Sequence, residues 1–176
     1  MFFSLLFFLL VTVAASIIGF SFKNGISPTP TSKKVKCALM SSLPDDLSGV
    51  ILELGSGWGS LAFALAKRYP NCQVIAYETS PVPYLFCLGC QLLRRFPNLL
   101  FLRKDFFFSS FDKASLVVCY LYPKAMQKLL LKFKKELKST ALVVTHTFSL
   151  MGKKPLLTLH AKDLYCTPIY HYQDFS

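Results

Sequence analysis

The stretch Val50-Ile-Leu-Glu-Leu-Gly-Ser-Gly-Trp-Gly59 decides the fold of this chain. Residues 50–54 form a short, mostly apolar run that is typical of a buried strand. The glycines at 55, 57 and 59 permit a tight turn and let a ligand approach the backbone closely. A helical pattern over 61–68 follows, so the free N–H groups and positive dipole end of that helix face the turn. This arrangement predicts a nucleotide or dinucleotide site on a doubly wound sheet.

An acidic residue follows the glycine turn at the spacing that such a site needs. A second apolar run over 72–77 ends at Glu78, about twenty residues after Gly59. At the tip of the second strand, a carboxylate can accept hydrogen bonds from both ribose hydroxyls of a nucleoside. The alternative is a solvated loop residue. A dinucleotide enzyme would carry its third glycine where this chain has Ser60, so the spacing argues against a dinucleotide.

These two segments resemble motifs of a known family. Glu-Leu-Gly-Ser-Gly-Trp-Gly at 53–59 and Ala-Tyr-Glu-Thr-Ser at 76–80 look like motifs I and II of class I S-adenosylmethionine-dependent methyltransferases. The resemblance covers most of the chain after the N-terminal segment and implies S-adenosylmethionine as the cofactor. The cofactor-binding residues that it implies here are Glu53, Gly55, Ser56, Gly57, Gly59, Glu78 and Thr79. The acidic residue at the place of Glu53 often reaches the methionine amino group in that family; a packing role is the alternative.

Helix and strand patterns alternate through the rest of the chain. Strands are predicted at 50–54, 73–77, 99–103, 116–120 and 141–145, and helices at 33–43, 61–69, 84–96 and 125–137. Pro81 and Pro83 are expected to delay the helix after the second strand until residue 84. Two further runs, at 156–160 and 168–172, suit a final antiparallel hairpin. The alternation predicts an α/β fold with a doubly wound, mostly parallel sheet, Rossmann-like and with right-handed crossovers.

The segments after the third and fourth strands carry further candidate site residues. The resemblance implies that Asp105 accepts from the exocyclic amine of the adenine and that Phe106 packs on its ring; ordinary loop residues are the alternative. The fourth strand ends in Tyr120-Leu-Tyr-Pro, where the methyl acceptor should lie because parallel sheets bind ligands at the carboxyl ends of their strands. Many amino-group methyltransferases have Asn/Asp-Pro-Pro-Tyr/Phe there. The departure argues against nucleic-acid adenine or glutamine as acceptor.

Three segments are similar to a lysine-methyltransferase group that includes relatives of the ATP synthase c-subunit lysine methyltransferase. They are Ile-Ser-Pro-Thr-Pro-Thr at 26–31, Tyr-Leu-Tyr-Pro at 120–123 and Thr-His-Thr-Phe-Ser-Leu at 145–150. In that family the first lies near the mouth of the site; a plain spacer is the alternative. Tyr120 and Tyr122 are candidate catalytic residues, because an apolar aromatic mouth suits a neutral amine and ring faces tolerate a methylated cation. His146 is a candidate base or positioning group, with a structural role as the alternative.

Residues 1–22 are almost unbroken in their apolar character and long enough to cross a bilayer as a helix. No basic residue precedes this run, and lysines at 23, 33, 34 and 36 follow it, which predicts a single-pass anchor with the catalytic domain in the cytoplasm. A signal sequence cleaved near Ala14-Ala15-Ser16 is the alternative. The predicted parts are an anchor (1–22), a linker or site-covering segment (23–32) and a methyltransferase domain (33–176).

The charge and the cysteines indicate which kinds of partner and ligand the chain is expected to bind. Twenty Lys and Arg against nine Asp and Glu give a net charge of +11, which favours an acidic partner, here a membrane surface rather than nucleic acid. The lysine-rich helix at 125–137 reads as a solvated face, or as a patch for a membrane or an acidic partner. Cys87 and Cys90 have metal or redox spacing, but with no second such pair and no nearby histidine, buried free thiols are favoured and no metal site is expected.

These observations predict an enzyme that transfers a methyl group from S-adenosylmethionine to a protein lysine. A small-molecule or lipid methyltransferase at the membrane is one alternative. The alternative of another class is a non-catalytic cofactor-binding or membrane-scaffold protein. The oligomeric state stays open.

Overall fold

A seven-stranded sheet lies at the centre of the computed structural model, which describes residues 1–175. The strands run in the order β3-β2-β1-β4-β5-β7-β6. Their bounds are β1 (Val50–Leu54), β2 (Gln73–Tyr77), β3 (Leu99–Leu102), β4 (Ala114–Cys119), β5 (Leu142–His146), β6 (Leu157–His160) and β7 (Pro168–Tyr172). Strands β1 to β5 pair in parallel, and β7 pairs antiparallel with both β5 and β6. The predicted mostly parallel sheet with a final hairpin is confirmed.

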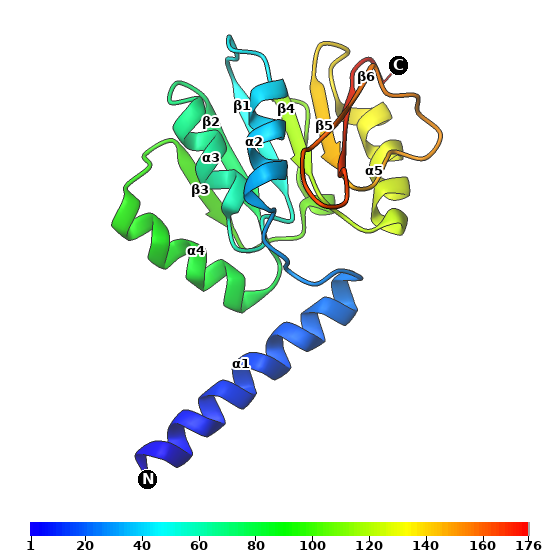
Figure 1. Cartoon of the computed structure of the whole chain (residues 1–176). Coiled ribbons are helices and arrows are strands. Elements are labelled where there is room, and N and C mark those ends of the chain that lie inside the picture. Colours follow the sequence, from blue (N-terminus) through cyan, green and yellow to red (C-terminus); the bar gives the residue numbers. More distant parts are fainter. Residues whose placement is uncertain (176) are drawn as a thin grey trace.

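Helices cover both faces of this sheet, and one helix projects away from it (Figure 1). They are α1 (Phe2–Asn24), α2 (Lys33–Ser42), α3 (Ser60–Arg68), α4 (Pro81–Arg94), the short 3-10 helix η1 (Phe106–Phe108) and α5 (Pro123–Glu136). Successive strand residues point to opposite faces. Ile51 therefore joins the core cluster that contains residues of α2 and α3, whereas Leu52 joins the cluster that contains residues of α5.

Helix α4 begins at Pro81 rather than at residue 84, so the expectation that the prolines delay it was wrong. Pro81 occupies the first helical position, where its missing N–H removes no hydrogen bond and its fixed φ already suits the helix. Helix α1 also extends beyond residue 22. It ends at Asn24, and Gly25 follows in the left-handed conformation with φ 70°, a common way to end a helix.

The order of the strands places a site at one edge of the sheet. From β1 the chain crosses to β2 on one side, and β4 then returns to pair with β1 on the other side. Ligands bind in the crevice that such a reversal opens at the carboxyl ends of the strands. The linker between α1 and α2 crosses this edge, and α1 projects from it (Figure 1).

Candidate functional site

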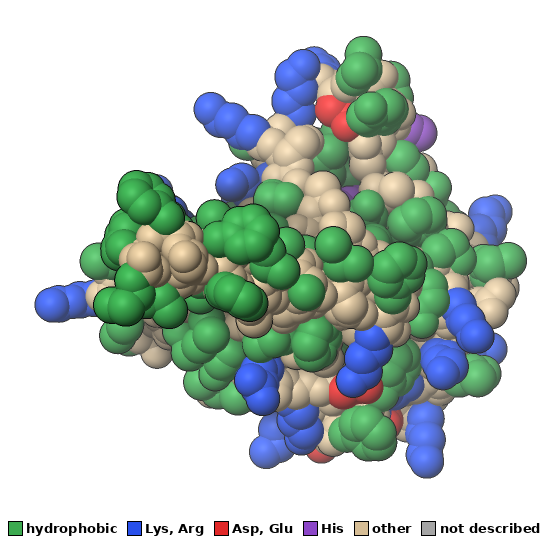
Figure 2. All heavy atoms as spheres, turned by 90° about the horizontal axis from the view of Figure 1, so that it is seen from below, with side chains coloured by type: hydrophobic (Ala, Val, Ile, Leu, Met, Phe, Trp, Pro, Cys, Tyr) green, Lys and Arg blue, Asp and Glu red, His purple; other side chains and the backbone are tan. Residues whose placement is uncertain are grey.

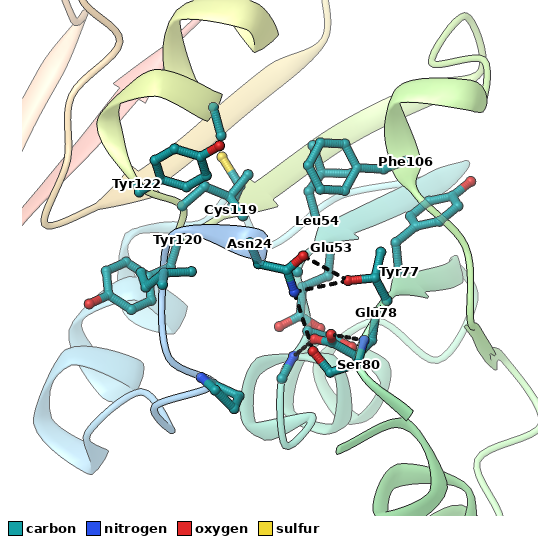
Figure 3. Close-up of a pocket in the computed structure, with 18 of the residues that line it drawn as sticks. Asn24, Glu53, Leu54, Tyr77, Glu78, Ser80, Phe106, Cys119, Tyr120 and Tyr122 are labelled. Atoms are coloured by element: carbon teal, nitrogen blue, oxygen red, sulfur yellow. Dashed lines mark hydrogen bonds between the residues drawn. The ribbon is translucent and has the colours of Figure 1, made fainter. Parts of the chain in front are cut away.

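A cavity of about 290 Å³ lies at the carboxyl ends of the strands, close to the lower end of the usual range for small-molecule sites, roughly 300–1,000 Å³. Its walls come from the glycine turn after β1, the tip of β2, the segment after β3, the tip of β4 and linker residues 26–31. In Figure 3, Tyr120 and Tyr122 lie on one side of the cavity, and Glu53, Glu78 and Ser80 face them from the other side.

The glycine turn and Glu78 are in direct contact. Glu78 Oε2 accepts a hydrogen bond from the Gly57 backbone N–H at 2.7 Å, and its Oε1 accepts from the Ser80 N–H at 2.7 Å. Gly55, Gly57 and Gly59 have φ angles of 79°, 52° and 74°, which glycine adopts without strain. Each carboxylate oxygen has a second lone pair, so Glu78 can hold the turn and still accept hydroxyl groups from a ligand.

Two buried polar atoms at the base of the turn lack a partner among residues 1–175: Glu53 Oε2 and Ser56 Oγ. Burial raises the pKa of the Glu53 carboxyl well above its usual range, and the nearby charge of Glu78 raises it further. Leaving buried polar groups unpaired costs free energy. The cradle therefore fits a ligand that brings hydrogen-bond donors and a positive charge to these atoms.

The residues after β3 also line the cavity. Asp105 Oδ1 accepts a hydrogen bond from the Phe107 backbone N–H at 2.9 Å and so caps η1, and the Phe106 side chain is buried against the cavity wall. Figure 3 shows Phe106 across the cavity from Ser80. The structure therefore brings the predicted adenine-side residues to the same cavity as the glycine turn.

Tyr120 forms an aromatic wall at the tip of β4. Its ring stacks on His146, with ring centroids 4.5 Å apart and planes 17° apart, and lies nearly parallel to Phe148 at 6.0 Å. Tyr120 and Tyr122 line the cavity, whereas His146 is buried behind Tyr120. His146 Nε2 lies 3.4 Å from Thr31 Oγ1 of the linker. The geometry suits a positioning role for His146 better than direct proton transfer.

The buried position of His146 gives a pH prediction. Desolvation lowers its pKa to about 4, against about 6.5 in the unfolded chain. Between these values the unfolded state binds more protons, so the free energy of unfolding rises with pH and falls as the solution is acidified. We expect His146→Phe to remove roughly 3 kcal/mol of this dependence between pH 6.5 and pH 4. The measurement is denaturant unfolding of both proteins in detergent across that window.

Other buried groups do not obscure this test. Burial also lowers the pKa of His171, which acts with the same sign as His146. The raised pKa of Glu53 acts with the opposite sign, because the free energy of unfolding falls with rising pH when a carboxyl stays protonated in the folded protein. Both groups are present in both proteins, so they cancel in the difference. Parallel pH profiles for the wild type and His146→Phe would contradict the assignment.

The end of α1 is a part of the site that the sequence did not reveal. Asn24 Nδ2 donates to Thr79 Oγ1 at 3.0 Å and to Ser80 Oγ at 3.3 Å, and Thr79 Oγ1 lies 3.2 Å from Asn24 Oδ1 (Figure 3). The predicted cofactor residue Thr79 lines the cavity, and its hydroxyl is engaged with Asn24. Pro28 of the linker lies 3.8 Å from the position that a Cβ on Gly57 would occupy. The linker therefore covers the glycine turn.

Cys87 packs beneath the same turn. Its Sγ donates to the Gly57 carbonyl oxygen at 3.3 Å, and burial raises the pKa of its thiol to about 12, so the thiol stays protonated. Both Cys87 and Cys90 are free cysteines. Within residues 1–175 no group of three or more His, Cys, Asp or Glu side chains is placed to hold a metal ion.

Comparison with known proteins identifies the family. A family model described as "ANTKMT methyltransferase domain" matches residues 53–157, more than half of the chain. The chain belongs to this family. The matched ANTKMT methyltransferase domain begins at Glu53 in the glycine motif and extends through β4, α5 and β5 to the start of β6. A search of curated protein sequences finds no match.

Solved structures share the fold of the ANTKMT methyltransferase domain. An RNA methyltransferase from Salinibacter ruber in complex with S-adenosyl-L-homocysteine has a TM-score of 0.70 and 23% identity, over 83% of this chain and 94% of that one. The B. subtilis tRNA methyltransferase TrmK has a TM-score of 0.62 and 11% identity, over 82% and 66%. PKMT2 from Rickettsia typhi in complex with AdoHcy has a TM-score of 0.50 and 18% identity, over 59% and 22%. At these identities, the similarities show the fold alone.

The family and the fold make this chain a class I methyltransferase with S-adenosylmethionine as its cofactor. The residues present fit that molecule. Its amino-acid end carries an ammonium group, which would supply a donor to the unpaired Glu53 Oε2 and favour the charged form of that carboxyl, and its ribose carries hydroxyls, which suit Glu78. The assignment of individual residues to parts of the cofactor stays a prediction.

Proposed function

We propose that this methyltransferase methylates the side-chain amine of a lysine in a protein. The observation that carries the proposal is the aromatic wall at the tip of β4, where Tyr120, backed by His146, lines the same cavity as Glu53 and the glycine turn. The name of the matched family supports it, because the letters KMT abbreviate lysine methyltransferase. Two segments resemble a lysine-methyltransferase group, and this cavity is lined by all of 26–31 and by the first three residues of 120–123.

We assign the cofactor contacts as follows. Gly55 and Gly57 let the backbone approach the cofactor, Glu78 accepts from the ribose hydroxyls, and Glu53 with Ser56 binds the amino-acid end. Asp105 and Phe106 flank the adenine. S-adenosylmethionine supplies a methyl group that is already activated on a sulfonium, so no metal or covalent nucleophile is required.

The acceptor amine must lose its proton before it can attack, and its ordinary pKa is about 10.4. The chain supplies two features that favour the neutral amine: apolar rings at the mouth, which desolvate it, and nearby positive charges. Lys23, Lys104 and Lys128 line the cavity. Buried His146 is neutral at pH 7, and Tyr120 positions the amine against the cofactor.

We further propose that α1 anchors the enzyme in a membrane as a single span, with residues 25–32 as a site-covering linker and the domain on the cytoplasmic side. Helix α1 has 23 residues, and its most apolar window has a mean hydropathy of 2.5 with none of it buried. A signal sequence near an N-terminus has similar features. Asn24 supports retention, because it connects the end of α1 to Thr79 and Ser80.

The test is methyl transfer into membranes and whole-cell lysate with S-adenosylmethionine labelled in its methyl group. We expect the label in the protein fraction. Label in the organic extract would favour a small-molecule or lipid acceptor, the second candidate, which the apolar helix beside the cavity favours. Label in RNA would contradict both. The N-terminal sequence of the mature protein tests the anchor, because a start after residue 15 would remove it.

Tyr120→Ala should lower kcat about 10- to 100-fold, because the acceptor loses the wall that orients it and a small misplacement is costly. Binding of S-adenosylmethionine should change less than about two-fold, since Tyr120 lies across the cavity from Glu78 and is not among the assigned cofactor contacts (Figure 3). Tyr120→Phe is the matched control. It keeps the ring that stacks on His146 and should retain most of the activity. Unchanged turnover in Tyr120→Ala would contradict the assignment.

A further inference from the structure

The outer face of α4 is apolar and exposed. Leu92 and Leu93 are 79% and 86% exposed, and Leu85 and Phe86 of the same helix are also exposed. At 3.6 residues per turn these four side chains fall within one arc of the helix, whereas Pro83 and Cys87 on the opposite arc are buried. We call the four exposed residues the α4 stripe. Large apolar side chains exposed together on one helix face mark an interaction site.

The α4 stripe is tied to the end of α1. Asn24, the last residue of α1, bonds to the side chains of Thr79 and Ser80, which immediately precede the first residue of α4. The two helices are also in contact. Once α1 crosses a bilayer, its C-terminal end lies at the membrane surface, and these bonds hold the start of α4 there as well.

The charges near the stripe select an anionic surface. Figure 2 views the molecule from the side on which α1 projects: the exposed hydrophobic side chains of α1 run across the middle, and Lys and Arg side chains of the domain project around the margin. A shallow groove of about 570 Å³ continues from the stripe at the end of α4, where the apolar Leu92 and Phe96 lie beside Arg95. An anionic lipid matches this combination, because its acyl chain suits the apolar side chains and its phosphate suits the arginine. A second copy would instead bring another net charge of +11 to the contact.

We propose that the α4 stripe sits in the interfacial layer of a membrane that contains anionic lipid, as a second membrane contact beside α1. This inference rests on the proposed anchor but not on the proposed acceptor. It fixes the orientation of the domain as well as its tether. The mouth of the cavity, which the linker after α1 covers, is then held against the membrane surface.

The chain carries its own reporter of this contact. Trp58, its single tryptophan, lies edge-on to Phe86 of the stripe, with ring centroids 5.2 Å apart. The full chain is reconstituted in nanodiscs of phosphatidylcholine and phosphatidylglycerol in equal parts, with and without doxyl-labelled phosphatidylcholine. We expect the doxyl lipid to quench Trp58 fluorescence. Leu93→Glu should reduce that quenching at least about two-fold, because a charge at this position opposes burial in the interface.

Leu131→Glu is the matched control. Leu131 is 71% exposed on α5, which has the same length as α4 but packs in the other core cluster. Quenching of Trp58 in Leu131→Glu should therefore equal that in the wild type. Equal quenching in all three proteins, or none in the wild type, would overturn the proposal. It would also be overturned if Leu93→Glu changed the oligomeric mass in detergent while lipid quenching stayed the same, since a second copy would then cover the stripe.

Two measurements on the same samples separate this inference from the proposed function. Calorimetric binding of S-adenosylmethionine and near-UV circular dichroism check that each variant is folded. Carbonate extraction of the membranes checks that α1 is retained. Intact methylation of protein with no lipid quenching overturns the α4 contact alone, whereas quenching with the methyl label only in lipid or RNA supports the contact and overturns the protein acceptor.

Discussion

Replacing Glu78 with alanine is expected to weaken binding of S-adenosylmethionine about 100-fold or more. The Glu78 carboxylate accepts from the backbone N–H groups of Gly57 and Ser80, both at 2.7 Å, and it is our assigned acceptor for the ribose hydroxyls. Hydrogen bonds to a charged group contribute about 1.5–3 kcal/mol each. The loss of the two proposed hydrogen bonds from the ribose hydroxyls therefore accounts for about 3 kcal/mol of binding free energy, which corresponds to about a hundredfold in affinity. Isothermal titration calorimetry measures it directly.

Two further variants serve as comparisons for the affinity of Glu78→Ala. Glu78→Gln keeps the shape but puts an amide NH₂ against one of the backbone N–H groups, so it should fall between the wild type and alanine. Glu136→Ala is the matched control: Glu136 lies on α5, away from the cavity, and accepts hydrogen bonds from Lys132 of the same helix and from the Phe111 backbone N–H before β4. It should leave the affinity within about two-fold, because it costs only local stability. Wild-type affinity in Glu78→Ala would show that the carboxylate is only a structural cap.

The second large effect is on stability. Gly59→Ala should lower the free energy of unfolding by about 3 kcal/mol, since a left-handed conformation costs a residue with a side chain about 1–2 kcal/mol and overpacking adds about 1–3 kcal/mol. Gly59 has φ +74°, and a Cβ there would lie 2.9 Å from Cys87 Sγ and 3.0 Å from the Phe63 ring. Denaturant unfolding in detergent, followed by Trp58 fluorescence and far-UV circular dichroism, gives the value.

Gly89→Ala is the control, and the expected sign is opposite. Gly89 lies in α4 with no atom within 4 Å of its Cβ position. Alanine there should stabilise the helix by about 0.5–1 kcal/mol, because glycine loses more backbone freedom on folding. If Gly59→Ala and Gly89→Ala behaved alike, the tight packing beneath the glycine turn would be contradicted.

Much of the fold follows from short-range patterns in the sequence. The run from Val50 to Gly59 encodes a strand, a turn and the start of a helix, and Glu78 comes at the end of the next strand. Both features depend on local spacing, and the parallel register of β1 and β2 then brings them together. The place of the aromatic residues after β4 could also be predicted from the sequence, because the carboxyl ends of the parallel strands in such a sheet border the site.

The remaining features depend on contacts between distant segments. Asn24 belongs to the site only because α1 ends where α4 begins, and nothing in the local sequence signals that meeting. The burial of His146 behind Tyr120 is set by the tertiary packing of β4 and β5. The start of α4 was misplaced for a different reason: Pro81 was read as an interruption, although proline is favoured at the first position of a helix.

The proposed acceptor is tested most directly by mass spectrometry of membranes incubated with S-adenosylmethionine that carries a deuterated methyl group. We expect deuterated methyl on the Nζ of a lysine in a protein, present with the wild-type enzyme and absent with Glu78→Ala. Deuterated methyl confined to lipid or RNA, or found in protein only on residues other than lysine, would contradict the proposed acceptor.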